Sequence, residues 1–255
     1  MSETNPKVPK RPWVVVNMAM SADGKVASAN RRVTRIGSDQ DLEALYALRS
    51  TADAILCGAR TVEETNATLG NGGERHRRNR RRRGLQEFPL RIVASAAGSL
   101  SSKAELWRHS FSPIIVLVTP RASASRIRRL RRLANDVVTY AGDPKSLGTA
   151  LARLAARRGI RRLVVEGGGI LNAALFAADC VDEIHLTLCP LLMGGRTAPS
   201  IADGPGFAEL ANAKHFKLVS AKPHGRELFT VYLRVGSESR KPGGPTRGRS
   251  PSGPS

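Results

Sequence analysis

A buried strand that runs into three consecutive glycines and then into a helix constrains the fold of this chain most. The run RLVVEGGGILN occupies residues 162–172. A short β-branched run bounded by glycine is typical of a strand, and the Ala/Leu/Phe pattern over 170–177 favours a helix. Backbone N–H groups of such glycines can approach an anion closely, and a helix N-terminus carries roughly half a positive charge. The junction therefore predicts either a phosphate cradle, with Glu166 at the lip of the sheet, or a tight turn with a solvated glutamate.

Along much of the chain, short apolar runs alternate with helical patterns. Between residues 90 and 180 this alternation indicates right-handed βαβ crossovers and a largely parallel sheet. After Asp182 the pattern changes to period two, which indicates antiparallel strands at the sheet edge. We therefore predict an α/β fold with a mixed sheet, mostly parallel with antiparallel C-terminal strands. Strands are expected at 14–18, 52–58, 90–95, 113–119, 137–140, 162–165, 183–188, 216–220 and 228–233, and helices near 39–51, 127–133, 147–154 and 170–177.

The composition favours a soluble, cytoplasmic protein without a metal. Of the 255 residues 41% are hydrophobic, so the chain can bury a sizeable core. We expect no signal peptide and no membrane span, because no apolar run approaches the roughly 20 residues needed to cross a bilayer. The three cysteines lack C-x-x-C spacing and are expected to be buried thiols in a reducing compartment. The five histidines form no H-x-x-x-H pair, which argues against a metal site.

The net charge of +20 lies mainly in loops and ends. The segment Arg75–Arg83 contributes +7, the tail from Gly236 contributes +3 and the first eleven residues contribute +2. Runs of this kind are usually solvated and disordered. We therefore expect a flexible leader at 1–11, one domain at 12–235 with a basic insertion at 70–87, and a disordered tail at 236–255.

A second basic feature is a predicted helix with an arginine face. Ile127, Leu130 and Leu133 form its apolar stripe, and five arginines between Arg126 and Arg132 form the other face. Such a face either holds an acidic partner or is simply solvated, and the solvated interpretation is favoured.

Three loops are expected at the carboxyl ends of strands, namely Ser21–Lys25, Gly58–Thr65 and Glu166–Gly169. Loops at that edge of a parallel sheet converge on one crevice. The glycine run is not the dinucleotide fingerprint G-x-G-x-x-G, because Asn172 stands where that pattern has Gly or Ala. The residues alone thus predict an anion- or nucleotide-binding α/β protein with a polar crevice.

Four motifs, in order and at matching spacing, resemble the pyrimidine reductases of riboflavin biosynthesis. MSADGKVA at 20–27 is similar to their S-x-D-G-K-I-A opening, and AILCGARTV at 54–62 is similar to D-A-I-x-x-G-x-x-T-V. VEGGGIL at 165–171 resembles V-E-G-G-x-x-L, and DEIHLTLCPLLMGG at 182–195 resembles D-E-x-x-x-x-x-x-P-x-x-x-G-G. The resemblance covers about 12–235, and the zinc-ligand motifs of the family's deaminase domain are absent.

The resemblance implies a dihydrofolate-reductase-like fold with helices on both faces of the sheet, a homodimer, and a reductase that uses NADPH without a metal. Its substrate would be a phosphoribosylamino-pyrimidine, whose ribose opens to an aldehyde or imine and is reduced at C1′ to the ribityl chain. The motifs name no catalytic residue and no proton donor. The residues implied by position are, for NADPH, Thr61, Thr65, Gly167, Gly168 and Gly169, and, for the substrate, Glu166, Arg49 and Lys25.

The chain departs from the family pattern after the second motif. Thr65, Asn66 and Ala67 stand where the family has D-D-P, so a carboxylate that typically touches the cofactor is missing. The family's arginine just downstream, a candidate ligand for the substrate phosphate, has no clear counterpart. We expect one or two arginines of Arg75–Arg83 to lie near the crevice mouth and to hold that phosphate instead.

Two alternatives stay open at this point. The first is a related reductase that acts on a pterin or on another carbonyl or imine substrate. The second is a nucleic-acid-binding protein on a retired reductase fold, driven by Arg75–Arg83. The sequence disfavours the second, because only 4% of residues are aromatic and none lies in the arginine run.

Overall fold

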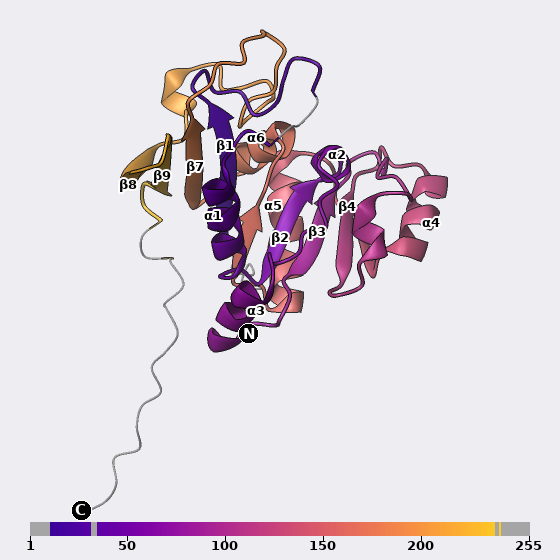
Figure 1. Ribbon diagram of the computed structural model, residues 1–255. Coiled ribbons are helices and arrows are strands. Elements are labelled where there is room, and N and C mark those ends of the chain that lie inside the picture. Colours follow the sequence, from indigo (N-terminus) through magenta and orange to yellow (C-terminus); the bar gives the residue numbers. More distant parts are fainter. Residues whose placement is uncertain (1–10, 32–34, 238–239, 241–255) are drawn as a thin grey trace, which may run out of the picture.

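The structure is a computed structural model that describes residues 11–31, 35–237 and 240. These residues form one sheet of nine strands in the order β5-β4-β3-β2-β6-β1-β7-β9-β8 (Figure 1). Strands β5 to β7 in this order pair in parallel, and β9 and β8 continue the sheet with antiparallel pairs. The predicted mixed sheet is confirmed. The strands are β1 (Trp13–Ser21), β2 (Ala54–Gly58), β3 (Leu90–Ala94), β4 (Ile114–Val118), β5 (Asp136–Thr139), β6 (Arg162–Val165), β7 (Glu183–Cys189), β8 (Phe216–His224) and β9 (Glu227–Arg234).

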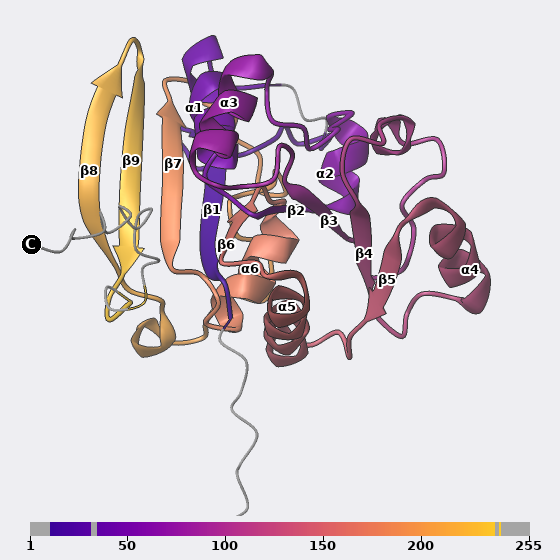
Figure 2. The same cartoon turned by 90° about the horizontal axis from the view of Figure 1, so that it is seen from below.

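Helices cover both faces of the sheet (Figure 2). On one face, α5 and α6 pack on the largest apolar cluster through side chains such as Leu151 and Leu175. On the other face, α1 contributes Leu48 to one cluster, and α2 and α4 contribute Val62 and Leu130 to another. No helix in the described part of the chain is long and apolar enough to span a membrane. The helices are α1 (Asp39–Arg49), α2 (Ala59–Glu64), α3 (Glu74–Arg82), α4 (Ala124–Leu133), α5 (Pro144–Arg158) and α6 (Gly169–Ala177), with short 3-10 turns η1 (Glu105–Arg108) and η2 (Leu210–Asn212).

Local sequence signals begin and end these helices. Ser38 accepts hydrogen bonds from two backbone N–H groups in the first turn of α1. Asp143, followed by Pro144, caps α5 in the same way, and α5 ends at Gly159, whose φ of 68° favours glycine. Each feature satisfies backbone groups that a helix end leaves unpaired.

The Asp-Glu pair of the fourth motif stabilises the fold. Asp182 is fully buried and accepts hydrogen bonds from Arg11 at 2.6 and 2.9 Å and from the backbone N–H of Val14 at 2.9 Å. Glu183 accepts a hydrogen bond from Trp13 Nε1 at 2.8 Å. The hydrogen bonds of these two carboxylates therefore hold the start of β1 against β7.

The arginine-rich segment is a folded helix. α3 is anchored by Arg80, which is fully buried. Arg80 Nη1 donates to the carbonyl oxygens of Arg49 at 2.7 Å and Ala52 at 2.5 Å, and Nε donates to Gln86 O at 2.8 Å. Burial lowers the pKa of Arg80 to about 10, so the side chain remains charged at neutral pH. One buried cation thus ties α3 to the end of α1.

This helix lies at the amino ends of the strands, opposite the end that carries α2 and the start of α6 (Figure 1). Arg80 binds Ala52, which shortly precedes β2. The expectations that the arginine run is disordered and lies close to the crevice mouth are therefore wrong, whereas most of its arginine side chains are exposed, as expected of a solvated run. Three further arginines of the run form ion pairs with glutamates, namely Arg75, Arg77 and Arg81.

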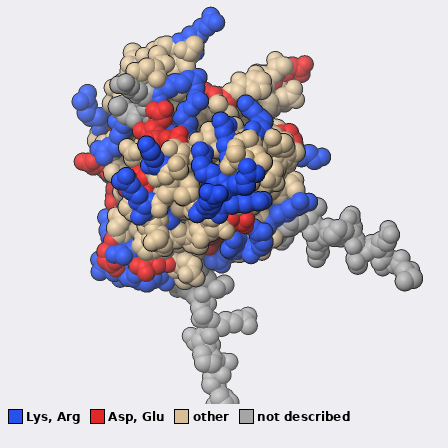
Figure 3. Space-filling view, turned by 90° about the vertical axis from the view of Figure 1, so that its right-hand side faces the viewer, with Lys and Arg blue, Asp and Glu red and all other residues tan. Residues whose placement is uncertain are grey.

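The face around α4 carries many Lys and Arg side chains (Figure 3). Arg128, Arg131 and Arg132 are exposed there, as expected of a solvated helix face. Residues 1–10 of the predicted leader and residues 238–239 and 241–255 of the predicted tail lie outside the described residues.

Arg80→Gln should lower the free energy of unfolding by about 3 kcal/mol or more, because hydrogen bonds to a charged group contribute about 1.5–3 kcal/mol each and the carbonyls would lose their partner. Chemical denaturation measures the change. Arg78→Gln, on the exposed side of the same helix, is the matched control and should stay within about 0.5 kcal/mol of wild type. Equally small effects in both variants would contradict the anchoring role of Arg80.

Candidate active site

The carboxyl edge of the sheet brings the first and fourth motifs together. Asp23, in the turn after β1, accepts hydrogen bonds from Ser21 Oγ at 2.6 Å and from the backbone N–H groups of Met193 at 3.1 Å and Gly194 at 2.7 Å. The Ser21 hydrogen bond, followed by the backbone N–H groups, lowers the pKa of Asp23 to about 2. These contacts hold the loops of both motifs at the end of β1.

The second and third motifs touch backbone to backbone. Gly58 N donates to Gly167 O at 2.7 Å, and a Cβ at Gly58 would lie 3.3 Å from Gly168 N. Thr61, in α2, faces the same loop, since a Cβ at Gly168 would lie 3.0 Å from Thr61 Oγ1. The ends of β2 and β6 therefore meet with no room for side chains between them.

The three glycines have different environments. Gly167 has a φ of 78°, and a Cβ there would lie 2.8 Å from Met18 Sδ. A Cβ at Gly169 would lie 2.5 Å from Ser200 O. The only neighbour that a Cβ at Gly168 would meet within 4 Å, in the described part of the chain, is the Thr61 hydroxyl. Packing within the protein therefore requires Gly167 and Gly169, whereas Gly168 presents its face beside Thr61.

The first turn of α6 has no side-chain cap. Gly168 is the N-cap residue, and it has no side chain that could accept a hydrogen bond from the first N–H groups of α6. Asn172 is fully buried, and its Nδ2 donates to Ile201 O at 2.8 Å. An uncapped helix N-terminus beside an open glycine fits an anionic group, because its N–H groups lack intrahelical partners.

Arg49 and Glu166 form a buried bidentate ion pair. Arg49 Nε and Nη2 donate to the two Glu166 oxygens at 2.6 and 2.5 Å, and Nη1 donates to Gly70 O at 2.5 Å. The side chains are only 8% and 10% exposed. Burial, the largest single influence, lowers the pKa of Arg49. The charge and the hydrogen bonds of Glu166 together raise it by more, so the pKa of Arg49 lies above its ordinary value. The pair fixes both oxygens of Glu166 at the carboxyl end of β6.

The remaining predicted site residues lie around this cluster. Lys25 is half-buried and forms an antiparallel bridge with Ser200, which borders Gly169. Thr65 lies at the C-terminal end of α2, where its Oγ1 donates to Thr61 O at 2.8 Å. The structure thus places Arg49 on Glu166, Thr61 beside Gly168, and Lys25 in the bridge with Ser200 beside Gly169. The ligand contacts assigned to these residues stay predictions.

The carboxyl half of β1 is partly exposed, although this strand lies inside the sheet. Its first four residues are buried, whereas the four residues from Asn17 are half-buried. Asn17 follows the pair Val16↔Val165, so it lies beside Glu166, and its side chain makes no hydrogen bond within the described residues. The sequence analysis missed Asn17, for which the available signal is a single amide within the apolar run VVVNMAM.

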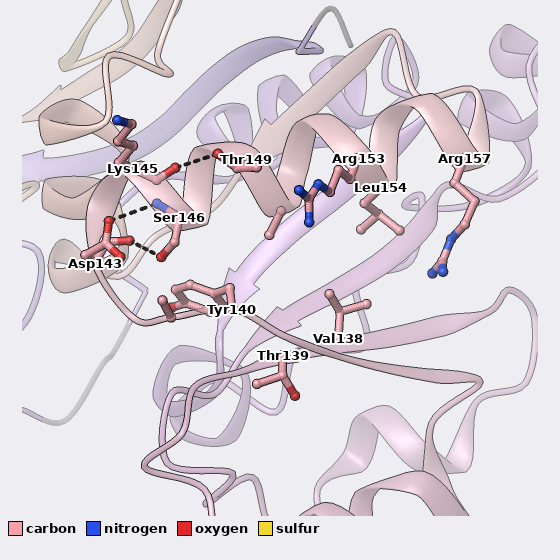
Figure 4. A pocket seen from close by; sticks show the side chains of 12 residues that line it. Val138, Thr139, Tyr140, Asp143, Lys145, Ser146, Thr149, Arg153, Leu154 and Arg157 are labelled. Carbon is pink, nitrogen blue, oxygen red and sulfur yellow. Dashed lines mark hydrogen bonds between the residues drawn. The ribbon is translucent and has the colours of Figure 1, made fainter. Parts of the chain in front are cut away.

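Two cavities of the described residues lie apart from the glycine loop. The larger, about 580 Å³, lies between β5 and α5, with Tyr140, Lys145 and Arg153 in its wall (Figure 4). The smaller, about 370 Å³, is lined by residues at the start of α1, around the β8–β9 turn and in the fourth motif, including Ser38, Glu227 and Leu191. Because the larger cavity contains none of the predicted site residues, the motif contacts define the candidate site better than cavity size.

The RibD C-terminal domain family matches residues 12–229 of this chain. The chain belongs to that family. It is 33% identical over 197 residues to the 2,5-diamino-6-ribosylamino-4(3H)-pyrimidinone 5′-phosphate reductase of Archaeoglobus fulgidus, which covers 77% of this chain and 89% of the relative. The family resemblance predicted from the four motifs is confirmed.

Solved structures of similar fold include RibD proteins. A pyrimidine reductase-like protein from Corynebacterium diphtheriae has a TM-score of 0.72 at 20% identity, covering 88% of this chain and 92% of that one. RibD of Acinetobacter baumannii has a TM-score of 0.69 at 20% identity and covers 88% of this chain. This chain spans only 58% of that RibD chain. At these identities the likeness shows the fold alone.

Replacing either member of the buried pair should destabilise the domain by about 3–5 kcal/mol, because the remaining charge stays buried without a partner. In a double-mutant cycle of Arg49→Met and Glu166→Gln, the loss in the double variant should be clearly smaller than the two single losses combined. The exposed pair Arg35–Asp39 is the control, with an expected coupling of about 0–1 kcal/mol. Additive losses at Arg49 and Glu166 would show that they act independently.

Proposed function

We propose that this chain is an NADPH-dependent oxidoreductase that reduces the ribose of a phosphoribosylamino-pyrimidine to the ribityl chain in riboflavin biosynthesis. Membership of the RibD C-terminal domain family and the named relative support the proposal. The observation that carries it is the meeting of all four motif loops at one sheet edge, where Arg49 fixes Glu166 next to the glycine loop.

Gly168, Thr61 and the start of α6 fit the phosphates of a nicotinamide dinucleotide. A side chain at Gly168 would fill the space beside Thr61 in which backbone N–H groups can meet a ligand. α6 is nine residues long and carries no side-chain cap, so its N-terminal N–H groups favour an anion. The bound cofactor would supply a hydride, and the residues of this chain would bind and orient it.

Glu166 is suited to bind the pyrimidine. Each carboxylate oxygen accepts one hydrogen bond from Arg49 and retains a lone pair for a ring N–H or an amino group. All three guanidinium nitrogens of Arg49 already donate to protein oxygens, so we assign Arg49 a positioning role through Glu166. Asn17, beside Glu166, offers a further amide, and Lys25 offers a cation for an anionic part of the substrate.

We also propose a homodimer that covers the β8 edge of the sheet. Leu218 and Val219, adjacent residues of β8, are 50% and 47% exposed, and Leu192 and Leu210 are 79% and 85% exposed. An exposed apolar edge strand is a template for pairing with another chain, and a second copy of this chain would cover it. Sedimentation as a monomer at micromolar concentration would contradict the dimer.

A cytoplasmic location is consistent with the cysteines. Cys57, Cys180 and Cys189 are free and buried, as expected in a reducing compartment. Cell fractionation would test this part of the proposal.

Gly168→Ala should weaken NADPH binding about tenfold or more, because the new methyl group blocks backbone approach to the phosphates. Its stability should change little, since the close neighbour is the movable Thr61 hydroxyl. Gly169→Ala, the matched variant, should instead lower the melting temperature, because its Cβ would meet the Ser200 carbonyl. Calorimetric titration and thermal unfolding separate the two effects, and wild-type NADPH affinity in Gly168→Ala would rule out the cradle.

The reaction itself is tested by NADPH oxidation with purified protein. The deaminated and non-deaminated phosphoribosylamino-pyrimidines should be compared with dihydrofolate at equal concentration. We expect turnover with one of the pyrimidines and none with dihydrofolate. Turnover with dihydrofolate alone would favour the related pterin reductase.

A further inference from the structure

Asp41 is a half-buried carboxyl group in the first turn of α1. It packs against Gly37 so closely that a Cβ at residue 37 would lie 2.2 Å from Asp41 Oδ2. The Thr187 side chain, on β7, forms a hydrogen bond with it. Burial raises the pKa of Asp41, and the nearby Glu227 carboxylate adds to this, while Thr187 and Arg35 oppose it. Among the described carboxyl groups whose pKa departs clearly from the ordinary value, Asp41 alone has a raised pKa.

Glu227 is held firmly beside Asp41. The backbone N–H of Ser38 donates to Glu227 Oε1 at 2.7 Å, and Ser38 Oγ donates to Oε2 at 2.6 Å. Cys189 Sγ lies 3.6 Å from Glu227 Oε1. The N-cap residue of α1 thus places one carboxylate next to another, an arrangement that favours a proton on the less well satisfied group.

Asp41 lies on the same side of α1 as the substrate-facing ion pair. Asp41, Leu45 and Arg49 are spaced four residues apart and therefore form one stripe of the helix. At 1.5 Å per residue, the first and last are about 12 Å apart along the axis. Arg49 reaches Glu166 at one end, while Asp41 reaches Thr187 at the other.

The part of β1 between these ends is small and open. Ala19 pairs in register with Thr187, and it belongs to the half-buried half of the strand. Its side chain is a single methyl group, the smallest on this half of β1. A substrate whose pyrimidine ring lies at Glu166 and whose ribose lies along β1 would bring its linking nitrogen and C1′ toward Asp41.

We propose that Asp41 is the proton donor for the reduction proposed above, on which this assignment rests. The open-chain substrate contains a C1′=N bond. The nitrogen lone pair takes the proton of Asp41, which leaves a carboxylate and an iminium. The cofactor, when bound, would supply the hydride that C1′ accepts, and the π electron pair would return to nitrogen as a lone pair. The substrate gains two electrons, the cofactor loses two, and the product is the secondary amine of the ribityl chain.

Solvent can restore the proton after each turnover. The cavity of about 370 Å³ is lined by Gly37, Ser38 and Glu227, the groups that surround Asp41. Solvent in this cavity can therefore exchange protons with Glu227, the neighbour of Asp41.

The charged and titratable neighbours of Asp41 come from several segments. Arg35 precedes α1 and is paired with Asp39 at 2.5 Å. Cys189 lies on β7, where burial raises its pKa to about 12, so it stays a neutral thiol. His224, at the end of β8, and Arg226, in the turn before β9, line the same cavity as Glu227. Glu227→Gln is the most informative change among these, because it removes the charge and keeps the shape that Ser38 binds.

The first test needs no activity. Carboxyl-carbon NMR of the full-length protein should show Asp41 titrating above the ordinary aspartate value of about 3.9. Glu227→Gln should move that titration to lower pH, because the repulsion is lost. Titration of Asp41 at or below the ordinary value would overturn the proposal.

Stability gives a second, independent readout. Because the folded pKa of Asp41 lies above its unfolded value, its protonated form adds stability below the unfolded pKa of about 3.9, and this stability is lost as pH rises through the folded pKa. Asp41→Asn stays neutral, so its melting temperature should exceed that of wild type at pH 8 and not at pH 3. A loss of stability at pH 8 would instead mark Asp41 as a residue that the fold needs ionised.

Kinetics complete the test. Asp41→Asn should lower kcat about 100-fold or more at neutral pH with unchanged NADPH affinity, and the deficit should shrink at acid pH, where solvent protonates the imine. Glu227→Gln should move the alkaline limb of the kcat profile to lower pH. Asp39→Asn, an exposed acid of the same turn, is the control and should match wild type.

These outcomes separate the two proposals. An active wild type with an equally active Asp41→Asn at neutral pH would overturn the proton donor alone. An inactive wild type with both pyrimidines would remove the proposed function and the proton donor with it.

Discussion

The buried ion pair between Arg49 and Glu166 connects the parts of this molecule that matter most for its site. Through its side chain, Arg49 holds the end of β6 and the Gly70 carbonyl, and its own carbonyl accepts a hydrogen bond from Arg80 of α3. Neither buried charge is stable without its partner, so the glycine loop, α1 and the segment that leads to α3 depend on one another. In the proposed function, the Glu166 carboxylate that this pair fixes would orient a planar substrate.

Local patterns in the sequence predict the parts of the fold that depend on local chemistry. β-branched runs, the Ser38 cap and the glycine junction each specify their own element, and the mixed sheet follows from their order. The pairing of Arg49 with Glu166 is not predictable in this way, because the two residues are 117 positions apart. The helix α3 is not predictable from the sequence either, because its polar composition indicates a solvated loop. Arg80 can be buried there only because the carbonyl oxygens of Arg49 and Ala52 accept its hydrogen bonds.

The candidate site is likewise predictable from the sequence only in part. The motifs identify the glycine loop, but three consecutive glycines look alike until their neighbours are known, and only then does Gly168 stand apart from Gly167 and Gly169. Asp41 reads in the sequence as an acid that favours a helix start. Its raised pKa cannot be predicted from the sequence, because the Glu227 carboxylate that contributes to it comes from β9 and is held beside the start of α1 by Ser38.

The most direct test of this site is the fate of the transferred hydrogen. NADPH labelled with deuterium at the transferable C4 position should be incubated with the protein and the phosphoribosylamino-pyrimidine, and the product analysed by mass spectrometry and NMR. A reductase that holds the pyrimidine at Glu166 and the cofactor at Gly168 should place one deuterium at C1′ of the ribityl chain. Deuterium on the pyrimidine ring, or an unlabelled product, would contradict the proposed reaction.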